Sequence, residues 1–342
     1  MEVESEPGHC LAQKRCPGSN LIHRVSGNLM NNLWSNIRKY IWSYAFVMPM
    51  FISFLGFTLY PLLASVRYTF YNWDGIGVPK DFVGFKHYTN IAKDPFFWNA
   101  FKNTLVYTVI LVPTQLTIAL GLAAVLNSQW LKARYIFRAV FFSPVVTSSA
   151  IVGIVISLLT STAGNDINRM LVNLGITERP IDWLGDPRTA MWMVVTVGIW
   201  IGLGYPMIYF LAALQSVEPE LYDAAKVDGA GNVALFWHIT IPSIRPVGLI
   251  VLLIAALHSL RVFDTVQVMT RGGPYFATDV VGTYIYRLAF YTTEGGDSYA
   301  RLGYASAAAF FMGLLVMGIS ILQLAAVRYA ARQRKEDQIT KP

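Results

Sequence analysis

Charged residues are scarce in this sequence. Only 14% of its 342 residues are Asp, Glu, Lys or Arg, whereas a soluble domain carries about 25%. Apolar residues make up 54%, and the mean hydropathy is +0.44. So little charge cannot cover a soluble globule of this size, and so much apolar content excludes a disordered protein. The composition therefore indicates an integral membrane protein, provided that the apolar residues form long blocks.

Residues for catalysis and metal binding are also few. The two cysteines, Cys10 and Cys16, lie near the amino terminus without a CxxC spacing, and the five histidines are scattered. No Ser-His-Asp arrangement is discernible. The chain has no Gly-Lys dipeptide and therefore no phosphate-binding loop of the GxxxxGK[ST] type. We expect no catalytic residue, no metal site and no cofactor bound by this chain, which does not hydrolyse ATP itself.

Long apolar blocks are what the sequence does have. They cover residues 41–66, 105–126, 139–164, 190–214, 247–268 and 303–327. Only the fifth block is interrupted, by His258, Arg261 and Asp264. A helix rises 1.5 Å per residue, so about 20 apolar residues cross the hydrocarbon core of a bilayer. The sequence predicts an all-α polytopic membrane protein with six transmembrane helices.

The basic residues predict the orientation of these helices. They are dense before the first block, between the second and third blocks, and after the last block: Lys14, Arg15, Arg24, Arg38, Lys39; Lys132, Arg134, Arg138; Arg328, Arg332, Arg334, Lys335 and Lys341. Six alternating spans put these three segments on one side, and Lys and Arg are enriched on the cytoplasmic side. Both termini are therefore predicted to be cytoplasmic.

A polar stretch between the fourth and fifth blocks, residues 216–242, predicts two short helices. Pro219 suits the first turn of a helix, and Glu218 and Glu220 complement its positive end. Gly229 fits the position after the helix end, where a positive φ is least costly without a Cβ. A second helix is expected from about Asn232 to Thr240, ending at Pro242. The pair would lie on the cytoplasmic face, either as a docking surface or as an interfacial element on lipid.

This stretch resembles a known motif. The pattern Asp223-Ala-Ala-x-x-Asp-Gly-Ala230, followed by Phe236, Ile239 and Pro242, resembles the EAA loop of type I ABC importer permeases. The first position is Asp223 where that loop usually has Glu. The acidic group is kept but its side chain is shorter by one methylene.

Other segments narrow the resemblance to the maltose-type sugar permeases. They are Phe82-Val-Gly-Phe-x-x-Tyr88, Asp94-Pro-Phe-Phe-Trp98, Asn103-Thr104, Val262-Phe-Asp264, Thr270-Arg-Gly-Gly-Pro274 and Tyr284-Ile-Tyr-Arg-x-Ala-Phe290. They occur in family-like order and spacing between about Tyr44 and Arg328. The resemblance implies the type I ABC importer transmembrane fold in a bacterial-type inner membrane.

The expected organisation follows from the blocks and the resemblance together. Residues 1–40 would be a mobile cytoplasmic tail, and 41–100 the first transmembrane helix with an extracytoplasmic loop. Residues 101–328 would form the ABC type I transmembrane domain, with five helices and the coupling loop 216–242. Residues 329–342 would be a basic cytoplasmic tail.

The resemblance also implies partners. The chain would associate with a second related permease and with two ATP-binding subunits that hold ATP and Mg. An extracytoplasmic substrate-binding protein would be a further partner. The resemblance implies no nucleic acid as a partner. The EAA loop would dock into an ATP-binding subunit, with small residues allowing close approach and acidic ones accepting hydrogen bonds. The coupling residues so implied are Glu220, Asp223, Ala224, Ala225, Asp228, Gly229, Ala230, Phe236 and Pro242.

Polar and aromatic residues inside the spans are candidates for the cargo path, because polar groups are costly in lipid. They are Tyr205, Tyr209, His258, Arg261, Asp264 and Gln267. Arg261 and Asp264, three residues apart on one helix, could instead form a structural ion pair. The two tyrosines could be ordinary packing aromatics. Gly198 and Gly202, spaced as GxxxG, indicate close helix contact rather than binding.

We compare three candidate functions for this chain. The first is a permease subunit of a binding-protein-dependent ABC importer for a sugar or oligosaccharide. The second is the same kind of subunit for glycerol 3-phosphate or another polyol derivative, which would call for more basic groups than Arg261 in the path. The third is a stand-alone secondary carrier, for which the sequence shows no inverted repeat and little evidence of a proton relay.

Overall fold

The computed structural model describes residues 40–128, 131–162, 164–290 and 300–340. The predicted amino-terminal tail, with Cys10 and Cys16, lies outside the described residues except for Tyr40. The chain divides into two compact units, residues 1–64 and 65–342. The described part of the first unit holds helix α2 (Ile41–Phe54), a π-helical turn, η1 (Leu55–Leu59), and the start of α3 (Tyr60–Tyr68), whose last residues belong to the second unit. This continuous helix of 28 residues is long and apolar enough to cross a membrane.

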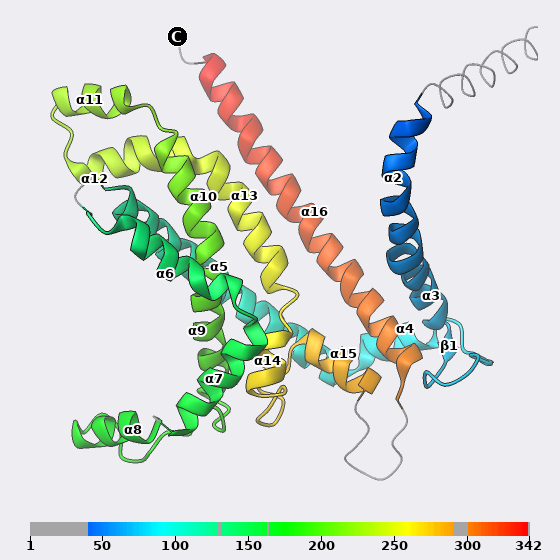
Figure 1. The fold of residues 1–342 in the computed structure, drawn as a ribbon. Helices are drawn as coiled ribbons and strands as arrows, with labels where there is room; N and C mark the ends of the chain where they lie inside the picture. Colours follow the sequence, from blue (N-terminus) through cyan, green and yellow to red (C-terminus); the bar gives the residue numbers. More distant parts are fainter. Residues whose placement is uncertain (1–39, 129–130, 163, 291–299, 341–342) are drawn as a thin grey trace, which may run out of the picture. The chain divides into compact units, whose positions relative to one another are not determined.

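The second unit begins with a small hairpin and two helices (Figure 1). Strands β1 (Tyr71–Asn72) and β2 (Asp81–Phe82) pair antiparallel, with Tyr71 opposite Phe82. Helix α4 (Lys86–Lys93) leads into the long α5 (Pro95–Asn127). The Asp94 side chain caps α5 by accepting a hydrogen bond from the Phe96 amide, and Pro95 occupies the first turn, where no amide hydrogen is needed.

The remaining helices follow in chain order. They are α6 (Arg134–Val146), α7 (Ser149–Thr162), α8 (Gly164–Asn173), α9 (Ala190–Gly202), α10 (Gly204–Gln215), α11 (Pro219–Val227), α12 (Asn232–Leu235), the π-helical η2 (Phe236–Thr240), α13 (Ile241–Ser259), α14 (Asp264–Met269), α15 (Val281–Phe290) and α16 (Leu302–Thr340). Helix α16 runs on into the segment that the sequence predicts as a basic tail.

The six predicted spans correspond to four continuous helices and two bent pairs among the described residues. The continuous ones are Ile41–Tyr68, Pro95–Asn127, Asn232–Ser259 and Leu302–Ala325. Helices α6 and α7 meet at 98°, and α9 and α10 at 45°. Counting each bent pair as one span gives up to six, as the sequence predicts.

Three of the predicted continuous helices are therefore wrong in detail. The block 190–214 bends by 45° between Gly202 and Gly204. The block 139–164 breaks at Thr147, which adopts an extended conformation three residues after Pro144. The block 247–268 breaks between Ser259 and Asp264, where Phe263 leaves helical geometry. Apolar composition predicts that a segment is long enough to span, but the breaks depend on local backbone geometry that hydropathy does not report.

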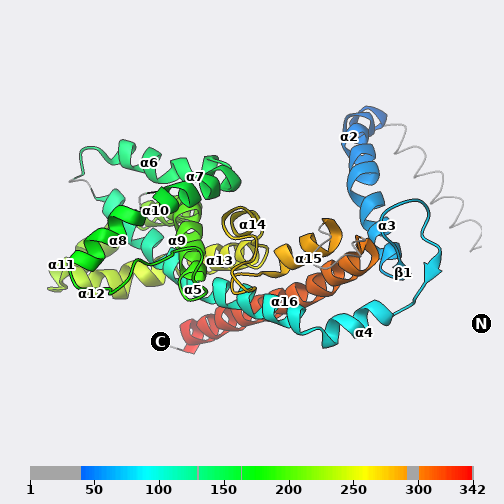
Figure 2. The same cartoon turned by 90° about the horizontal axis from the view of Figure 1, so that it is seen from below.

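Helix α5 is the centre of the second unit and contacts α9, α10, α13 and α15 (Figures 1 and 2). Its buried positions include Ala119 and Ala123, whose small side chains let neighbouring helices approach. A Cβ at Gly198 would collide with Tyr107 of α5, and one at Gly202 with Gln115. The close helix contact predicted from the GxxxG spacing is confirmed.

Candidate functional site

The polar stretch 216–242 forms the expected helix pair. Helix α11 starts with Pro219 in its first turn, and Gly229 follows its end with φ +83°. The Gly229 amide donates to the Lys226 carbonyl at 3.0 Å, and the Ala230 amide donates to the Ala225 carbonyl at 2.9 Å. These two bonds are the Schellman arrangement, which requires a left-handed residue at the position of Gly229. The predicted role of this glycine in the backbone is confirmed.

The exposed helix pair, defined here as residues 219–240, presents a mixed apolar and acidic surface. Four apolar side chains are exposed on it, namely Leu221, Val227, Val233 and Trp237. Asp223 forms an ion pair with Lys226 at 3.0 Å, and both side chains are largely solvent-exposed. Glu220, Ala224 and Asp228 lie nearby on the same short helix or at its end. Exposed apolar groups beside acidic ones are suited to a protein partner.

The second helix of the pair differs from the prediction. Helix α12 passes through η2, which holds Phe236, and then directly into α13, so the chain does not stop at Pro242. Pro242 is the second residue of α13 and lies inside this continuous helix, close after the π-helical turn. The π-helical turn before it shifts the hydrogen-bond register locally. The pair is thus continuous with a membrane-spanning helix.

Short and bonded connections tie the helix pair to two spans. Helix α10 ends at Gln215 and α11 begins at Pro219, which leaves three connecting residues. The Tyr222 hydroxyl and the buried Thr240 Oγ1 lie 3.0 Å apart in a hydrogen bond between α11 and η2. Helices α10 and α13 contact each other. A push on α11 would therefore reach α10 and α13 with little slack.

Two of the candidate cargo residues, Asp264 and Tyr205, contact the residues that flank a helix break. Asp264 is the first residue of α14, and its carboxylate accepts a hydrogen bond from Ser149 Oγ, the first residue of α7, at 3.4 Å. Tyr205 of α10 packs edge-on against Phe142 of α6 at 5.8 Å between ring centroids. Phe142 and Ser149 flank the break at Thr147. The bent span α6–α7 thus contacts both Asp264 and Tyr205.

The hypothesis of an Arg261–Asp264 ion pair is wrong for the described structure. No ion pair joins them among the residues that the structure describes. The i,i+3 argument needs one continuous helix, and α13 has already ended at Ser259. His258, Arg261 and Asp264 are exposed in the isolated chain, as are Tyr205 and Tyr209, while Gln267 is half-buried.

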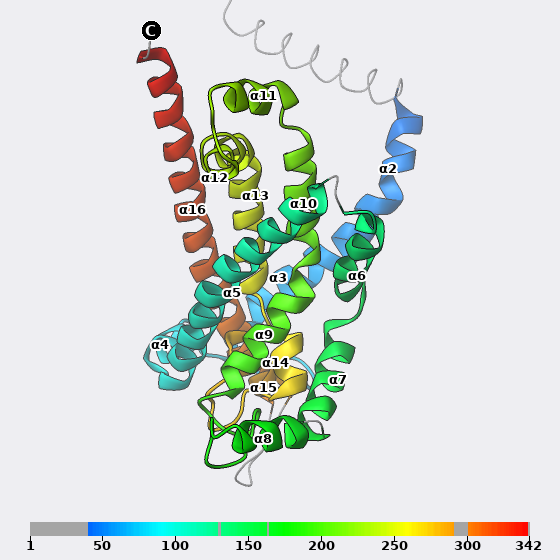
Figure 3. The same cartoon turned by 90° about the vertical axis from the view of Figure 1, so that its left-hand side faces the viewer.

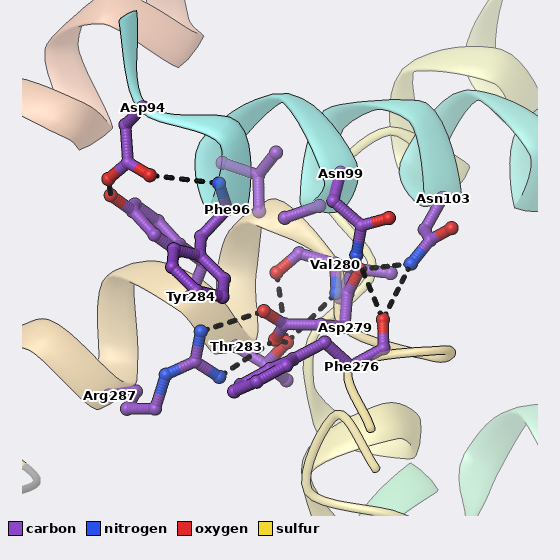
Figure 4. Close-up of polar contacts among 12 residues, drawn as sticks. Asp94, Phe96, Asn99, Asn103, Phe276, Asp279, Val280, Thr283, Tyr284 and Arg287 are labelled. Atoms are coloured by element: carbon purple, nitrogen blue, oxygen red, sulfur yellow. Dashed lines mark hydrogen bonds and ion pairs between the residues drawn. The ribbon is translucent and has the colours of Figure 1, made fainter. Parts of the chain in front are cut away.

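A second polar arrangement, which sequence reasoning missed, joins segments far apart in the chain (Figure 4). Asp279, only 1% exposed, receives two hydrogen bonds from the Arg287 guanidinium, at 3.1 and 2.8 Å, and a third from Thr283 Oγ1 at 2.7 Å. Asn103 of α5 donates to the Asp279 carbonyl at 3.0 Å and to the Phe276 carbonyl at 3.1 Å. A buried carboxylate is tolerated because its oxygens are fully paired.

Asp94 extends this arrangement. Besides capping α5, it accepts a hydrogen bond from the Tyr284 hydroxyl at 2.6 Å and one from the Tyr304 hydroxyl at 3.3 Å. Burial, and then the bond to Asp94, raise the pKa of the Tyr284 phenol well above its ordinary value. We call the residues Asp94, Asn99, Asn103, Asp279, Thr283, Tyr284, Tyr304 and Arg287 the Asp279 cluster.

The Asp279 cluster joins residues from separate segments that carry the family resemblance. Asp94, Asn103 and Tyr284 come from three different motifs of the sequence, and the structure brings them to one place (Figure 4). The available sequence signal was an opposite-charge pair, Asp279 and Arg287, in an otherwise apolar region. Their pairing depends on a loop conformation that the sequence pattern does not give.

The fold and these sites define a class: a polytopic membrane protein with bent spans, polar groups at the bends and an exposed helix pair joined to two spans. Residues 105–335 match the family described as "binding-protein-dependent transport system inner membrane component". The chain belongs to this family. Among the described residues no group of His, Cys, Asp and Glu could hold a metal ion.

Similar proteins include sugar transport permeases. The chain is 34% identical to the lactose transport system permease protein LacF of Rhizobium radiobacter, over 88% of this chain and 98% of that protein. It is 31% identical to the arabinooligosaccharides transport system permease protein AraP of Bacillus subtilis, over 89% and 94%. A solved bacterial alginate ABC transporter, in complex with an alginate pentasaccharide-bound periplasmic protein, matches with TM-score 0.71 at 27% identity, over 85% of this chain and 95% of that one.

Proposed function

We propose that this chain is one permease subunit of an ATP-driven importer for a sugar or oligosaccharide. It pairs with a second related permease and with two ATP-binding subunits, and receives cargo from an extracytoplasmic binding protein. The exposed helix pair, on a chain that belongs to the binding-protein-dependent family, is the observation that carries the proposal. Family membership also argues against a stand-alone carrier.

The helix pair is the coupling element in this proposal. Gly229 leaves open space where a Cβ would be, since apart from its chain neighbours no described residue has an atom within 4 Å of that position. A partner surface can therefore approach the turn closely. Val227 and Trp237, which are exposed, provide apolar contact area, and Asp223 and Asp228 provide hydrogen-bond acceptors.

The central experiment is reconstitution. The chain, its permease partner and the ATP-binding subunits are placed in lipid vesicles, and ATP hydrolysis and sugar uptake are measured with and without the loaded binding protein. We expect hydrolysis and uptake to depend on that protein. Sugar uptake by vesicles that contain this chain alone would support the stand-alone carrier and contradict the proposal.

The proposed topology places both termini and the helix pair in the cytoplasm. The motivating observation is the density of basic residues in 132–138 and 328–335. In a variant with Cys10 and Cys16 replaced by serine, a cysteine at Ile76 is expected to react with an impermeant reagent in intact cells. A cysteine at Asn232 is expected to react only after permeabilisation. Labelling of Asn232 from outside would contradict the topology.

The cargo path is proposed to pass Tyr205, Tyr209, His258, Arg261, Asp264 and Gln267, where the spans are bent. Rings can stack on the apolar face of a sugar, and the polar groups can bind its hydroxyls. Asp264→Ala should lower uptake several-fold while the complex still assembles. Asp264→Asn, which keeps hydrogen-bonding capacity, should retain more activity. Uptake at the unmodified rate in Asp264→Ala would remove Asp264 from the path.

An anionic cargo, such as a phosphorylated polyol, is the second candidate. The observation that favours it is that Arg261 forms no ion pair within the described structure, so its charge is available. Arg261→Gln separates the two candidates. An anionic cargo predicts a large loss of uptake, since an unpaired anion would remain, whereas a neutral sugar predicts a small loss.

A further inference from the structure

The segment that joins α5 to α6 is strongly basic and has no acidic counterpart. It carries Lys132, Arg134 and Arg138, whereas the sequence has no Asp or Glu between Asp94 and Asp166. None of the three basic residues forms an ion pair with the residues that the structure describes. Their positive charge is therefore uncompensated within the described structure.

Two of these cations are held close to one aromatic ring. Arg134 and Arg138 are four residues apart on α6 and so share one face of the helix. Their guanidinium carbons lie 5.3 and 5.7 Å from the centroid of the Tyr135 ring. The ring stabilises each cation, but two like charges on one helix face repel each other. An anion that contacts both guanidinium groups would replace this repulsion by attraction.

Most hydrogen-bond donors of the two arginines lack an acceptor in the described structure, although a guanidinium group carries five N–H donors. The single hydrogen bond of this pair to a described residue runs from Arg138 Nη2 to the Leu126 carbonyl in the last turn of α5, at 3.4 Å. The Arg138 Nε atom is buried and has no partner among the described residues. Buried donors are nearly always paired, so this one indicates an acceptor from outside the chain.

The start of α6 also favours an anion. Arg134 is the first residue of this helix, Ala133 before it provides no side-chain cap, and the first turn contains no acidic residue. The beginning of a helix carries partial positive charge, which acidic groups stabilise and basic groups do not. Phosphate groups bind at such positions. A bound anion would therefore compensate the helix dipole and the arginines together.

The surroundings are those of a membrane boundary. Residues 128–133 connect α5 to α6, and both α5 and the bent pair α6–α7 are apolar enough to span. Tyr135, Ile136 and Phe137 are exposed beside the arginines, as is typical of side chains at the level of lipid headgroups. Figures 1 and 3 place the start of α6 at the end of its unit that carries α11 and α12. With α11 in the cytoplasm, as proposed above, this is the leaflet with the negative surface potential.

We infer that Arg134, Arg138 and the start of α6 form a binding site for the phosphate group of an anionic phospholipid of the cytoplasmic leaflet. The guanidinium groups would donate to the phosphate oxygens, and Lys132 would add attraction at longer range. The exposed Ile136 and Phe137 would contact the acyl chains. The inference goes beyond the transport function and depends only on the proposed topology, which the cysteine labelling described above tests separately.

The test uses the assembled transporter in micelles of a neutral detergent, titrated with phosphatidylglycerol that carries pyrene on an acyl chain. Energy transfer from tryptophan to pyrene measures the bound lipid. Unlabelled phosphatidylglycerol, phosphatidylcholine and inorganic phosphate are then added as competitors. The main variant combines Arg134→Gln with Arg138→Gln. A second combines Arg134→Lys with Arg138→Lys and keeps both charges. The control combines Arg245→Gln with Arg328→Gln, which removes two exposed arginines outside the site.

We expect the half-saturating lipid concentration to rise about tenfold in the double glutamine variant, because each basic residue near an anionic lipid surface contributes to binding. The rise should be smaller in the double lysine variant, and the control should behave as the unmodified transporter. Only phosphatidylglycerol should compete. Arg134→Gln alone, which leaves the contact of Arg138 with α5 in place, should give an intermediate rise and is the test if the double variant does not purify.

Four results would overturn the inference. An equal rise in the control and in the double glutamine variant would mean that binding follows net charge alone. Equal competition by phosphatidylcholine would mean that the site does not recognise an anionic headgroup, and competition by inorganic phosphate would indicate a site for a soluble anion. Loss of the ATP-binding subunits from the double glutamine variant would assign the arginines to a carboxylate of that partner.

Discussion

The exposed helix pair and the Asp279 cluster both contain residues that carry the family resemblance, yet they differ in almost every physical respect. Asp223 and Lys226 of the helix pair form an ion pair in which both side chains are largely exposed to solvent. Asp279 is buried and fully paired, and it joins α5 and α15 with the loop between α14 and α15. An exposed pair contributes about 0–1 kcal/mol to folding, whereas a buried one is costly to break.

The difference separates outward-acting residues, whose side chains are exposed and available to a partner protein, from inward-acting residues, whose contacts stabilise the fold of their own chain. These side chains of the helix pair contribute little to folding stability, since four of the apolar ones remain exposed. The Asp279 cluster has few hydrogen-bonding groups available to a partner, because most of its polar side chains are already hydrogen-bonded within this chain. Changes in the cluster should therefore affect folding, and changes in the helix pair should affect coupling. Four predictions, arranged by their expected effect on folding free energy, test this division.

The largest effect is expected for Asp279→Ala. It leaves the Arg287 guanidinium partly buried without its carboxylate, and breaking a buried pair from one side costs about 3–5 kcal/mol. The purified protein should show a lower thermal unfolding midpoint and a lower level in the membrane. The double variant with Arg287→Ala should lose less than the sum of the two single changes. Additive losses would show that the pair is not coupled.

Tyr284→Phe should have the next largest effect. It removes the 2.6 Å hydrogen bond to Asp94, and a bond to a charged group contributes about 1.5–3 kcal/mol. The pKa of Tyr284 is raised in the folded state from its ordinary value of 10.0, so the unfolded chain loses this proton first as the pH rises. Stability from this group is therefore complete below pH 10 and declines above it. Tyr284→Phe should flatten that decline, which thermal unfolding across alkaline pH would measure.

A smaller loss of stability, with a much larger loss of coupling, is expected for Gly229→Asp. A residue with a Cβ at φ +83° costs about 1–2 kcal/mol, and the new side chain meets no atom of this chain within 4 Å of its Cβ. The new Cβ therefore has room beside the described residues, and we expect the added group to clash with a partner. The chain should insert normally but fail to retain the ATP-binding subunits on purification. Gly231→Ala is the matched control, because Gly231 has φ −75° and the same open space.

The sequence predicted the outward-acting region better than the inward-acting one, for a physical reason. Helix starts and ends are local events, so Pro219 and Gly229 could be placed from their neighbours alone. The pairing of Asp279 with Arg287 and the contacts of Asn103 bring together residues up to 176 positions apart in the chain. They depend on how α5 packs against the loop between α14 and α15, which no local pattern specifies.

The breaks in the spans could be predicted from the sequence only in part. Pro144 and the Gly202-Leu-Gly204 sequence mark places where a helix can bend, and the bends of 98° and 45° occur there or close by. The break between Ser259 and Asp264 carries no such signal, since the residues there are Leu, Arg, Val and Phe. That is why the sequence placed Arg261 and Asp264 on one helix face, and why the expected ion pair is absent from the described structure.

The smallest effect on folding is expected for Val227→Ser. The Val227 side chain is 87% exposed, and surface substitutions of this kind change folding free energy by less than about 0.5 kcal/mol. If the helix pair docks into an ATP-binding subunit, losing this apolar contact should still weaken the complex. The measurement is the fraction of ATP-binding subunit retained on purification, together with stimulated ATP hydrolysis. Val78→Ser, which changes a 72% exposed valine outside both regions, is the control and should alter neither. Equal behaviour of the two variants would mean that Val227 faces lipid or solvent rather than a partner. The proposed role of outward-acting residues in coupling would then be contradicted.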